Sequence, residues 1–134
     1  MQNSSYADAL ERGRAAAEKS PAVLDAVMAI VRPVVECNRK QIDNGRTYLR
    51  EMIFGDPEEP HHRQALALSA ETEEAVVAIL RRDESVTEPE ASAQARIISA
   101  IMFVSMAASI NIGRTVDDLL QDIRTQAAVL LGQK

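Results

Sequence analysis

The sequence predicts an all-α protein, a bundle of about six helices that forms one domain over residues 1–134. Three observations predict this fold class. Apolar residues recur at helical spacing along most of the chain, and no segment of useful length alternates apolar and polar residues as a strand does. The five glycines and five prolines act as punctuation between the helical segments. A chain of this length buries about two-thirds of its unfolded surface, which is enough for a core without disulfides.

The composition is typical of a globular protein, with 46% hydrophobic and 26% charged residues. Aromatic residues make up only 3% and the net charge is −5. We therefore expect no DNA binding by this chain alone, because phosphate contacts need a basic face and base stacking needs aromatic side chains. The single cysteine, Cys37, excludes an internal disulfide framework and a thiolate metal cluster. The N-terminus lacks the apolar core of a signal peptide, which predicts a cytoplasmic protein.

The first predicted helix spans Tyr6 to Lys19, with Leu10 and Ala17 on one side. Residues 2–5 are polar, and we expect them to be frayed. Gly13 lies inside this helix and weakens it by about 1 kcal/mol relative to alanine.

The second predicted helix begins at Ser20 and Pro21, because serine is a common N-cap and proline fits the first helical position. Pro33 removes one backbone donor inside this helix and is expected to kink it. Asn44 and Gly45 are expected to end it, as a left-handed cap would. The positions that share one helical face and predict its buried side are Leu24, Val27, Val31, Val34 or Val35, Asn38 and Ile42.

Two further helices and a loop follow. Arg46 to Phe54 is predicted to be a short helix, Gly55 to Pro60 a loop, and His61 to Arg82 an amphipathic helix. Arg81 and Arg82 stand at the end of the longer helix, where positive charge complements the helix dipole. The side chains expected to face inward are Tyr48, Leu49, Met52 and Ile53 in the short helix and Leu66, Ala70, Val76, Val77 and Leu80 in the long one.

The stretch from Thr87 to Gly113 is the helix around which we expect the rest of the chain to be organised. Thr87 and Glu90 predict a capping box at its start, and Gly113 is expected to end it. From Ile97 to Ile112 it carries no charge, so it has no polar back and must be covered on more than one side. It is too short for a membrane span, which needs roughly 18 or more apolar residues, and we expect no membrane insertion.

The last predicted helix begins at Thr115, which precedes Asp118 by the spacing of an N-cap and its partner. The break at 111–114 is short enough to fold this helix back antiparallel beside the preceding one. We therefore expect the last two helices to pair with those of a second copy in a four-helix dimer interface, which would cover the remaining apolar side. The residues predicted for this homodimer interface are Ile101, Ser105, Ala108, Ile123 and Leu130.

As a string of helices, the chain resembles the C-terminal, effector-binding and dimerisation domain of TetR-family transcriptional regulators. The residues that carry the resemblance are AVVAILRRDESV, then the alanine-rich PEASAQARIISAIMFVSMAASI, then the aspartate-led TVDDLLQDIRTQAAVLLG. Residues 21–60 look like the pair of helices before that family's long loop, and residues 6–19 like the helix that connects its two domains. The resemblance implies transcription regulation through a small-molecule effector. The family's helix-turn-helix reader is not among these residues, so we expect either a fragment of a longer regulator or a chain that has lost its reader.

A mostly apolar ligand pocket is expected among these helices, because methionines adapt to irregular ligands. Asn38 falls on an apolar helix face, where an unpaired amide costs roughly 1–3 kcal/mol. It is expected to bond either a ligand or backbone that Pro33 leaves free. Core packing alone is the alternative for each methionine. The predicted ligand-binding residues are Met28, Val35, Asn38, Tyr48, Met52, Met102 and Met106.

No catalytic, metal or cofactor site is predicted, so an enzyme is the weakest hypothesis. His61 and His62 are adjacent and point about 100° apart on a helix, which disfavours a shared metal. Cys37 has no histidine close in sequence to activate it, and the acidic residues of the loop at 55–60 lack the ligand spacing of a calcium site. The alternative function is a stand-alone helical homodimer that binds protein partners and senses no ligand.

Overall fold

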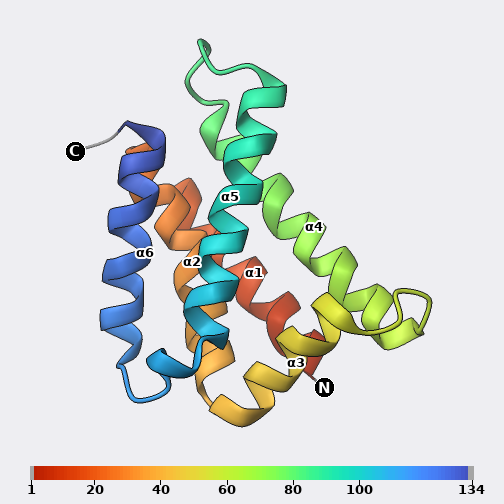
Figure 1. Cartoon of the computed structure of the whole chain (residues 1–134). Coiled ribbons are helices and arrows are strands. Elements are labelled where there is room, and N and C mark those ends of the chain that lie inside the picture. The colour runs from red at the N-terminus through yellow and green to blue at the C-terminus, as the bar shows by residue number, and fades with distance from the viewer. Residues whose placement is uncertain (1, 133–134) are drawn as a thin grey trace.

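The computed structural model describes residues 2–132, which form six α-helices, one short 3-10 turn and no strand (Figure 1). The all-α fold class predicted from the sequence is confirmed. No helix of these residues is long and apolar enough to cross a bilayer. The elements are α1 (Gln2–Glu18), α2 (Val23–Arg39), α3 (Ile42–Phe54), α4 (Pro60–Leu80), α5 (Glu88–Ala107), η1 (Ser109–Asn111) and α6 (Val116–Leu131).

Helix α2 is the centre of the bundle, because it contacts each of the other five α-helices. Most of its side chains are buried. In Figure 1, α5 crosses in front of α2, while α6 and α4 lie on either side. The helix at residues 88–107, around which the fold was expected to be organised, is therefore one of the helices packed around α2. The reason is that α2 buries most of its side chains and exposes only a charged edge, whereas α5 keeps an exposed apolar stripe.

Helix α1 packs closely against α2 at Gly13. A Cβ added there would lie 3.1 Å from the carbonyl oxygen of Ala29 and 3.1 Å from the Cα of Ile30. The Ala29 carbonyl is the one that Pro33 leaves without an intrahelical donor, because proline has no N–H. The helix propensity lost at Gly13 is thus accompanied by close packing against this part of α2.

The first helix begins earlier than predicted, and the second begins later. Residues 2–5, expected to be frayed, belong to α1, where Asn3 is buried and hydrogen-bonded to the start of α4. Ser20 does not cap α2. Its hydroxyl donates to the carbonyl oxygen of Ala16 at 3.1 Å, at the end of α1, and α2 starts at Val23 without a side-chain cap.

Asn44 and Gly45 do not end a helix, contrary to the prediction, but lie within α3. Among the described residues only Gly132 has a positive φ, so Gly45 forms no left-handed cap. Its role is a close approach: an added Cβ would lie 2.3 Å from the backbone oxygen of Asn38. The end of α2 and the start of α3 therefore meet at a point where a side chain does not fit.

Helix α5 ends at Ala107, well before the predicted end at Gly113. Arg46 donates from Nε to the carbonyl oxygen of Ala107 at 2.9 Å, and Arg39 donates to three carbonyl oxygens of the loop that follows. Carbonyl groups at a helix end lack intrahelical partners, so such donors allow the chain to leave the helix without losing hydrogen bonds. Arg82, expected to complement its own helix, donates instead to carbonyl oxygens at the end of α1.

Two predicted helix starts are confirmed. Thr87 and Glu90 form the capping box of α5, and the Thr115 side chain accepts the backbone N–H of Asp118 at the start of α6. In α3 and α4, which lie at the edge of the bundle, the buried side is narrower than predicted. Three residues expected to face inward there are exposed: Ile53, Leu66 and Ala70.

Candidate ligand-binding site

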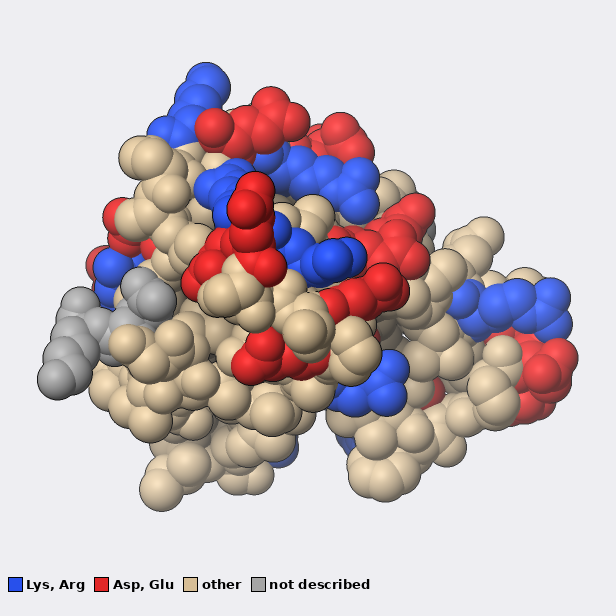
Figure 2. All heavy atoms as spheres, turned by 90° about the horizontal axis from the view of Figure 1, so that it is seen from above, with Lys and Arg blue, Asp and Glu red and all other residues tan. Residues whose placement is uncertain are grey.

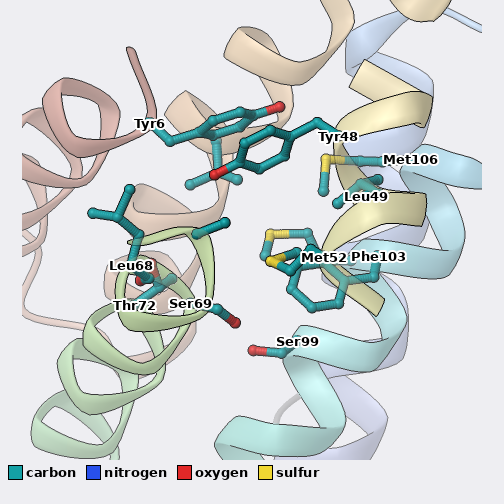
Figure 3. Close-up of a pocket in the computed structure, with 13 residues that line it drawn as sticks. Tyr6, Tyr48, Leu49, Met52, Leu68, Ser69, Thr72, Ser99, Phe103 and Met106 are labelled. Atoms are coloured by element: carbon teal, nitrogen blue, oxygen red, sulfur yellow. Dashed lines mark hydrogen bonds between the residues drawn. The ribbon is translucent and has the colours of Figure 1, made fainter. Parts of the chain in front are cut away.

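An apolar cavity lies between α4 on one side and α3 and α5 on the other, with single contributions from α1 and α2 (Figure 3). About 460 Å³ of space here is unfilled by atoms, including space that opens to solvent, and only about 40 Å³ admits the centre of a water molecule. The cavity is therefore narrow. Its lining residues are Tyr6, Val34, Tyr48, Leu49, Met52, Ala65, Leu68, Ser69, Thr72, Ser99, Met102, Phe103 and Met106.

The cavity walls are apolar and contain several flexible side chains. Met52, Met102 and Met106 come from α3 and α5, together with Phe103, and Leu68 of α4 lies across from them (Figure 3). None of the lining residues is charged at neutral pH. Methionine side chains are unbranched and polarizable, so they fill irregular gaps and rearrange readily. Walls of this kind can adapt to a ligand of irregular shape.

Two stacked tyrosines close one end of the cavity. The rings of Tyr6 and Tyr48 have centroids 4.6 Å apart and an interplanar angle of 21°. The amide of Asn38 donates to the Tyr6 hydroxyl at 2.8 Å and to the carbonyl oxygen of Gly45 at 3.3 Å. Asn38 therefore acts from behind the cavity, holding Tyr6 in place, and its second amide atom, Oδ1, is buried without a partner.

The Tyr48 hydroxyl connects the cavity to the N-terminal end of α1. It donates to Oδ1 of Asn3 at 2.6 Å. The Asn3 amide in turn donates to the carbonyl oxygen of His61 at 3.2 Å and to Oε1 of Gln64 at 3.2 Å, both in α4. Sequence reasoning missed this network, because its members are separated by about half the chain and Asn3 carries no local signal.

The tyrosine pair predicts a loss of stability at alkaline pH. Burial raises the pKa of Tyr48 to about 12, and it also raises that of Tyr6 above the ordinary value of 10.0. Above pH 10 the unfolded chain releases these protons while the folded chain keeps them. The free energy of unfolding is thus expected to fall as the pH rises from about 10 to about 12. Below pH 10 the tyrosines are protonated in both states, so they make the stability no more dependent on pH. Both tyrosines of the chain line the cavity, so tyrosinate absorbance checks this directly; titration of the folded protein near pH 10 would contradict it.

Two serine hydroxyls stand at the other end of the cavity. Figure 3 shows Ser69 of α4 and Ser99 of α5 pointing toward one another, away from the tyrosines. Ser99 is only 8% exposed. Thr72, one turn from Ser69, donates to the carbonyl oxygen of Leu68 at 2.8 Å. Among residues 2–132 neither serine hydroxyl has a hydrogen-bond partner. Neither oxygen is among the fully buried polar atoms, so both can donate to and accept from a molecule in the cavity.

The cavity brings together some of the predicted ligand-binding residues. Val35 is fully buried in the core of α2, and its neighbour Val34 lines the cavity in its place. Met28 is also a core residue, and Asn38 lies behind Tyr6, where it lines a separate surface hollow. The four predicted residues that do line the cavity are Tyr48, Met52, Met102 and Met106.

The contribution of α4 to the cavity was not predicted. A signal was present, since Ala65, Leu68, Ser69 and Thr72 follow one another at helical spacing. The predicted inward face began instead at Leu66 and Ala70, which are exposed. The polar character of Ser69 and Thr72 hid this face, because small hydroxyl residues look like a solvent-facing side.

The five residues predicted for the dimer interface do not share one exposed surface. Ile123 is 0% exposed, and Ser105 is also buried, so both face the interior of their own chain. Ile101 and Leu130 are half-buried. Ala108 lies beyond the end of α5, in extended conformation, because the helix ends at the preceding residue.

The exposed apolar surface of α5 is an uncharged stripe. Ile97 and Val104 are 45% and 67% exposed, and Ile101 lies between them on the same helix face. On α6, Val129 is 78% exposed. Figure 2 shows most Lys, Arg, Asp and Glu side chains gathered in the upper part of the view, with a broad uncharged area at the lower edge. That edge is the side on which α5 faces the viewer in Figure 1.

The remaining candidate residues have structural partners. Glu59 caps α4 by accepting the backbone N–H of His62, whose Nδ1 lies 3.0 Å from the carbonyl oxygen of Asp56. No three His, Cys, Asp or Glu side chains of the described residues are grouped so as to hold a metal. Cys37 is half-buried, and burial raises the pKa of its thiol, which disfavours the reactive thiolate.

Comparison with models of protein families finds no match, and comparisons with curated proteins and with solved structures find none either. These comparisons therefore identify no family for this chain.

Proposed function

We propose that this chain is the effector-binding and dimerisation domain of a TetR-like transcriptional regulator. It binds a small, mostly apolar molecule in the cavity between α3, α4 and α5. The observation that carries the proposal is the lining of that cavity, which is apolar and comes from five helices with only a few polar groups. Small-molecule sites have this composition, because apolar walls provide affinity and a few polar groups fix the orientation.

Ligand binding acts on the N-terminal end of α1. Because so little of the cavity is wide enough even for water, a larger molecule displaces the methionine side chains and pushes α4 away from α5. Tyr48 moves with the wall, and its hydrogen bond carries the movement to Asn3. The resemblance places the connection to a DNA reader at this end of the chain. The ligand then favours one placement of the two readers by shifting an existing equilibrium.

Filling the cavity is expected to abolish ligand binding while the fold survives. Met102 is 3% exposed and lines the cavity, so Met102→Trp places a large ring in the space that a ligand needs. Ala93→Trp, on the exposed side of the same helix, is the matched control. Apolar compounds identified by their effect on tyrosine fluorescence are titrated by calorimetry into both variants. Unchanged affinity in Met102→Trp would place the ligand elsewhere.

The proposed partner of the apolar stripe on α5 is a second copy of this chain. The stripe is formed by Ile97, Ile101 and Val104, and no charged residue occurs from 97 to 112. A two-fold axis through it therefore brings no like charges together. A stable interface buries about 1,600 Å² in total, so the contact extends from α5 to α6, where Val129 is exposed.

The variant Val104→Glu is expected to be monomeric. In the dimer its carboxylate would be desolvated against its own symmetry mate, at a cost of several kcal/mol per ion. In the single chain Val104 is largely exposed, so the fold is expected to survive. At the half-buried Ile101, the same change would combine dissociation with unfolding. Light scattering at micromolar concentration compares the molar mass of this variant with that of Ala67→Glu, a control on the exposed side of α4. If the wild-type protein is itself a monomer, the proposed dimer is wrong.

A stand-alone helical module without a ligand is the competing function. It is favoured by apolar side chains that are exposed away from the stripe, including Phe54 at 82% and Ile110 at 87%. The experiments above separate the two functions. A dimer whose cavity responds to no apolar compound favours the module, and a ligand response that Met102→Trp removes favours the sensor.

A further inference from the structure

We propose that the cavity selects an uncharged ligand, a mostly apolar molecule whose single hydroxyl or carbonyl group binds between Ser69 and Ser99. This inference rests on the proposed function, since it names the class of molecule that the same cavity takes. It also assigns the two serines as the residues that orient the ligand.

The absence of charge in the lining excludes ionic ligands. The residues that line the cavity are apolar, aromatic or hydroxyl-bearing, and none is an acid or a base at neutral pH. An ion that enters such a site loses its hydration and finds no opposite charge, which disfavours its binding. The nearest ion pair between α4 and α5 joins the half-buried Glu73 to the exposed Arg96 at 3.6 Å, and neither residue lines the cavity.

The serine hydroxyls provide a polar contact that nothing in the described chain uses. Serine in a helix commonly donates to the carbonyl four residues earlier, as Thr72 does to Leu68. Neither Ser69 nor Ser99 does so, and Ser99 is more than nine-tenths buried. Neither serine oxygen is among the fully buried polar atoms without a partner, so both remain accessible from the cavity that they line. A ligand group that accepts from one serine and donates to the other gains hydrogen bonds there without displacing any that the described chain makes. A neutral hydroxyl group can do both, and a carbonyl can accept from both.

The position of the serines orients the ligand. In Figure 3 the serines lie at one end of the cavity, the stacked rings of Tyr6 and Tyr48 at the other, and Met52 and Leu68 between them. Both tyrosine hydroxyls already have hydrogen-bond partners, in Asn38 and Asn3. The polar end of the ligand therefore binds at the serines, and its apolar part extends along the methionines toward the tyrosine rings.

Three compounds with one chain length test the charge selectivity at pH 7: octan-1-ol, octanoate and octylammonium. The chain has two tyrosines and no tryptophan, and both tyrosines line the cavity, so intrinsic fluorescence reports on the site itself. Octanol is expected to bind at least about 100-fold more tightly than either ion, given the desolvation cost of a charge. If octanoate or octylammonium binds as tightly as octanol, the inference is overturned, while ligand binding by the cavity still stands.

The serine assignment is tested with the double variant Ser69→Ala and Ser99→Ala, which keeps the cavity shape. Octanol affinity is expected to fall about tenfold or more, because two hydrogen bonds are lost. Ser92→Ala, an exposed position on α5, is the matched control and should bind octanol like the wild type. Unchanged affinity in the double variant would refute the role of the serines. If no compound of the series binds and Met102→Trp alters no ligand response, the cavity takes no apolar ligand and both proposals fall.

Discussion

Replacing Gly45 with alanine is expected to lower the free energy of unfolding by about 3 kcal/mol, which for a chain of this size lowers the Tm by roughly 10 °C. The added Cβ would lie 2.3 Å from the backbone oxygen of Asn38 and 2.9 Å from its Cγ and Nδ2. Neither neighbour can give way easily, since one is main chain and the other is held by Tyr6. The end of α2 and the start of α3 must therefore separate, and the gain in helix propensity of about 1 kcal/mol does not offset this.

Gly113→Ala is the matched control for this prediction. No atom lies within 4 Å of a Cβ built at Gly113, and its φ is not positive. The Tm of this control is expected to equal that of the wild type or exceed it slightly, because alanine restricts the unfolded chain more than glycine does. Thermal unfolding followed by circular dichroism compares the two variants. Equal Tm values would mean that α2 and α3 do not meet at Gly45.

The second large effect is expected for Arg39→Met, which should destabilise the protein by about 2–4 kcal/mol and loosen the loop between α5 and α6. Nη2 of Arg39 donates to the carbonyl oxygens of Asn111 at 2.9 Å, Ile112 at 3.0 Å and Arg114 at 3.1 Å. The two N–H groups of Nη2 are shared among these three oxygens, and a hydrogen bond to a charged group contributes about 1.5–3 kcal/mol. Their sum is reduced by the cost of burying the guanidinium, whose Nη1 has no partner and whose pKa is lowered by burial. Methionine keeps the apolar stem, so the change reports on the hydrogen bonds.

A local measurement separates the loop from the rest of the fold. Trypsin cleavage after Arg114 is expected to accelerate in Arg39→Met more than its lower stability alone explains. Arg39→Lys should lose less stability than Arg39→Met, because an ammonium nitrogen carries three N–H donors for the carbonyl oxygens that share the two of Nη2. Arg50→Met, at an exposed arginine of α3, is the control and should change stability by less than about 0.5 kcal/mol. If trypsin cleaves Arg39→Met after Arg114 at the wild-type rate, the loop is held by its own contacts, such as the hydrogen bond from Asn111 to the carbonyl oxygen of Ser105.

The sequence predicted the types of residue that line the candidate site better than it predicted which residues they are. The sequence indicated that methionines and Tyr48 were suitable for an apolar pocket, and four of these side chains do line one cavity. It could not distinguish Val34 from Val35, because adjacent residues of a helix differ by about 100° in direction and both are apolar. It also passed over Ser69 and Ser99, whose hydroxyls have the same local appearance whether they face water or a cavity.

By itself, the sequence determined the helical fold class, the apolar positions at the core of α2 and the caps at Thr87 and Thr115, because these depend on spacing over a few residues. Only the tertiary structure decided that α2 rather than α5 is central and that α5 ends at Ala107. It also decided that Asn3 contacts Tyr48. The physical reason is the same in each case. A helix end, a buried amide or a cavity wall depends on donors and side chains that arrive from residues far away in the chain, as Arg39 and Arg46 do at the end of α5.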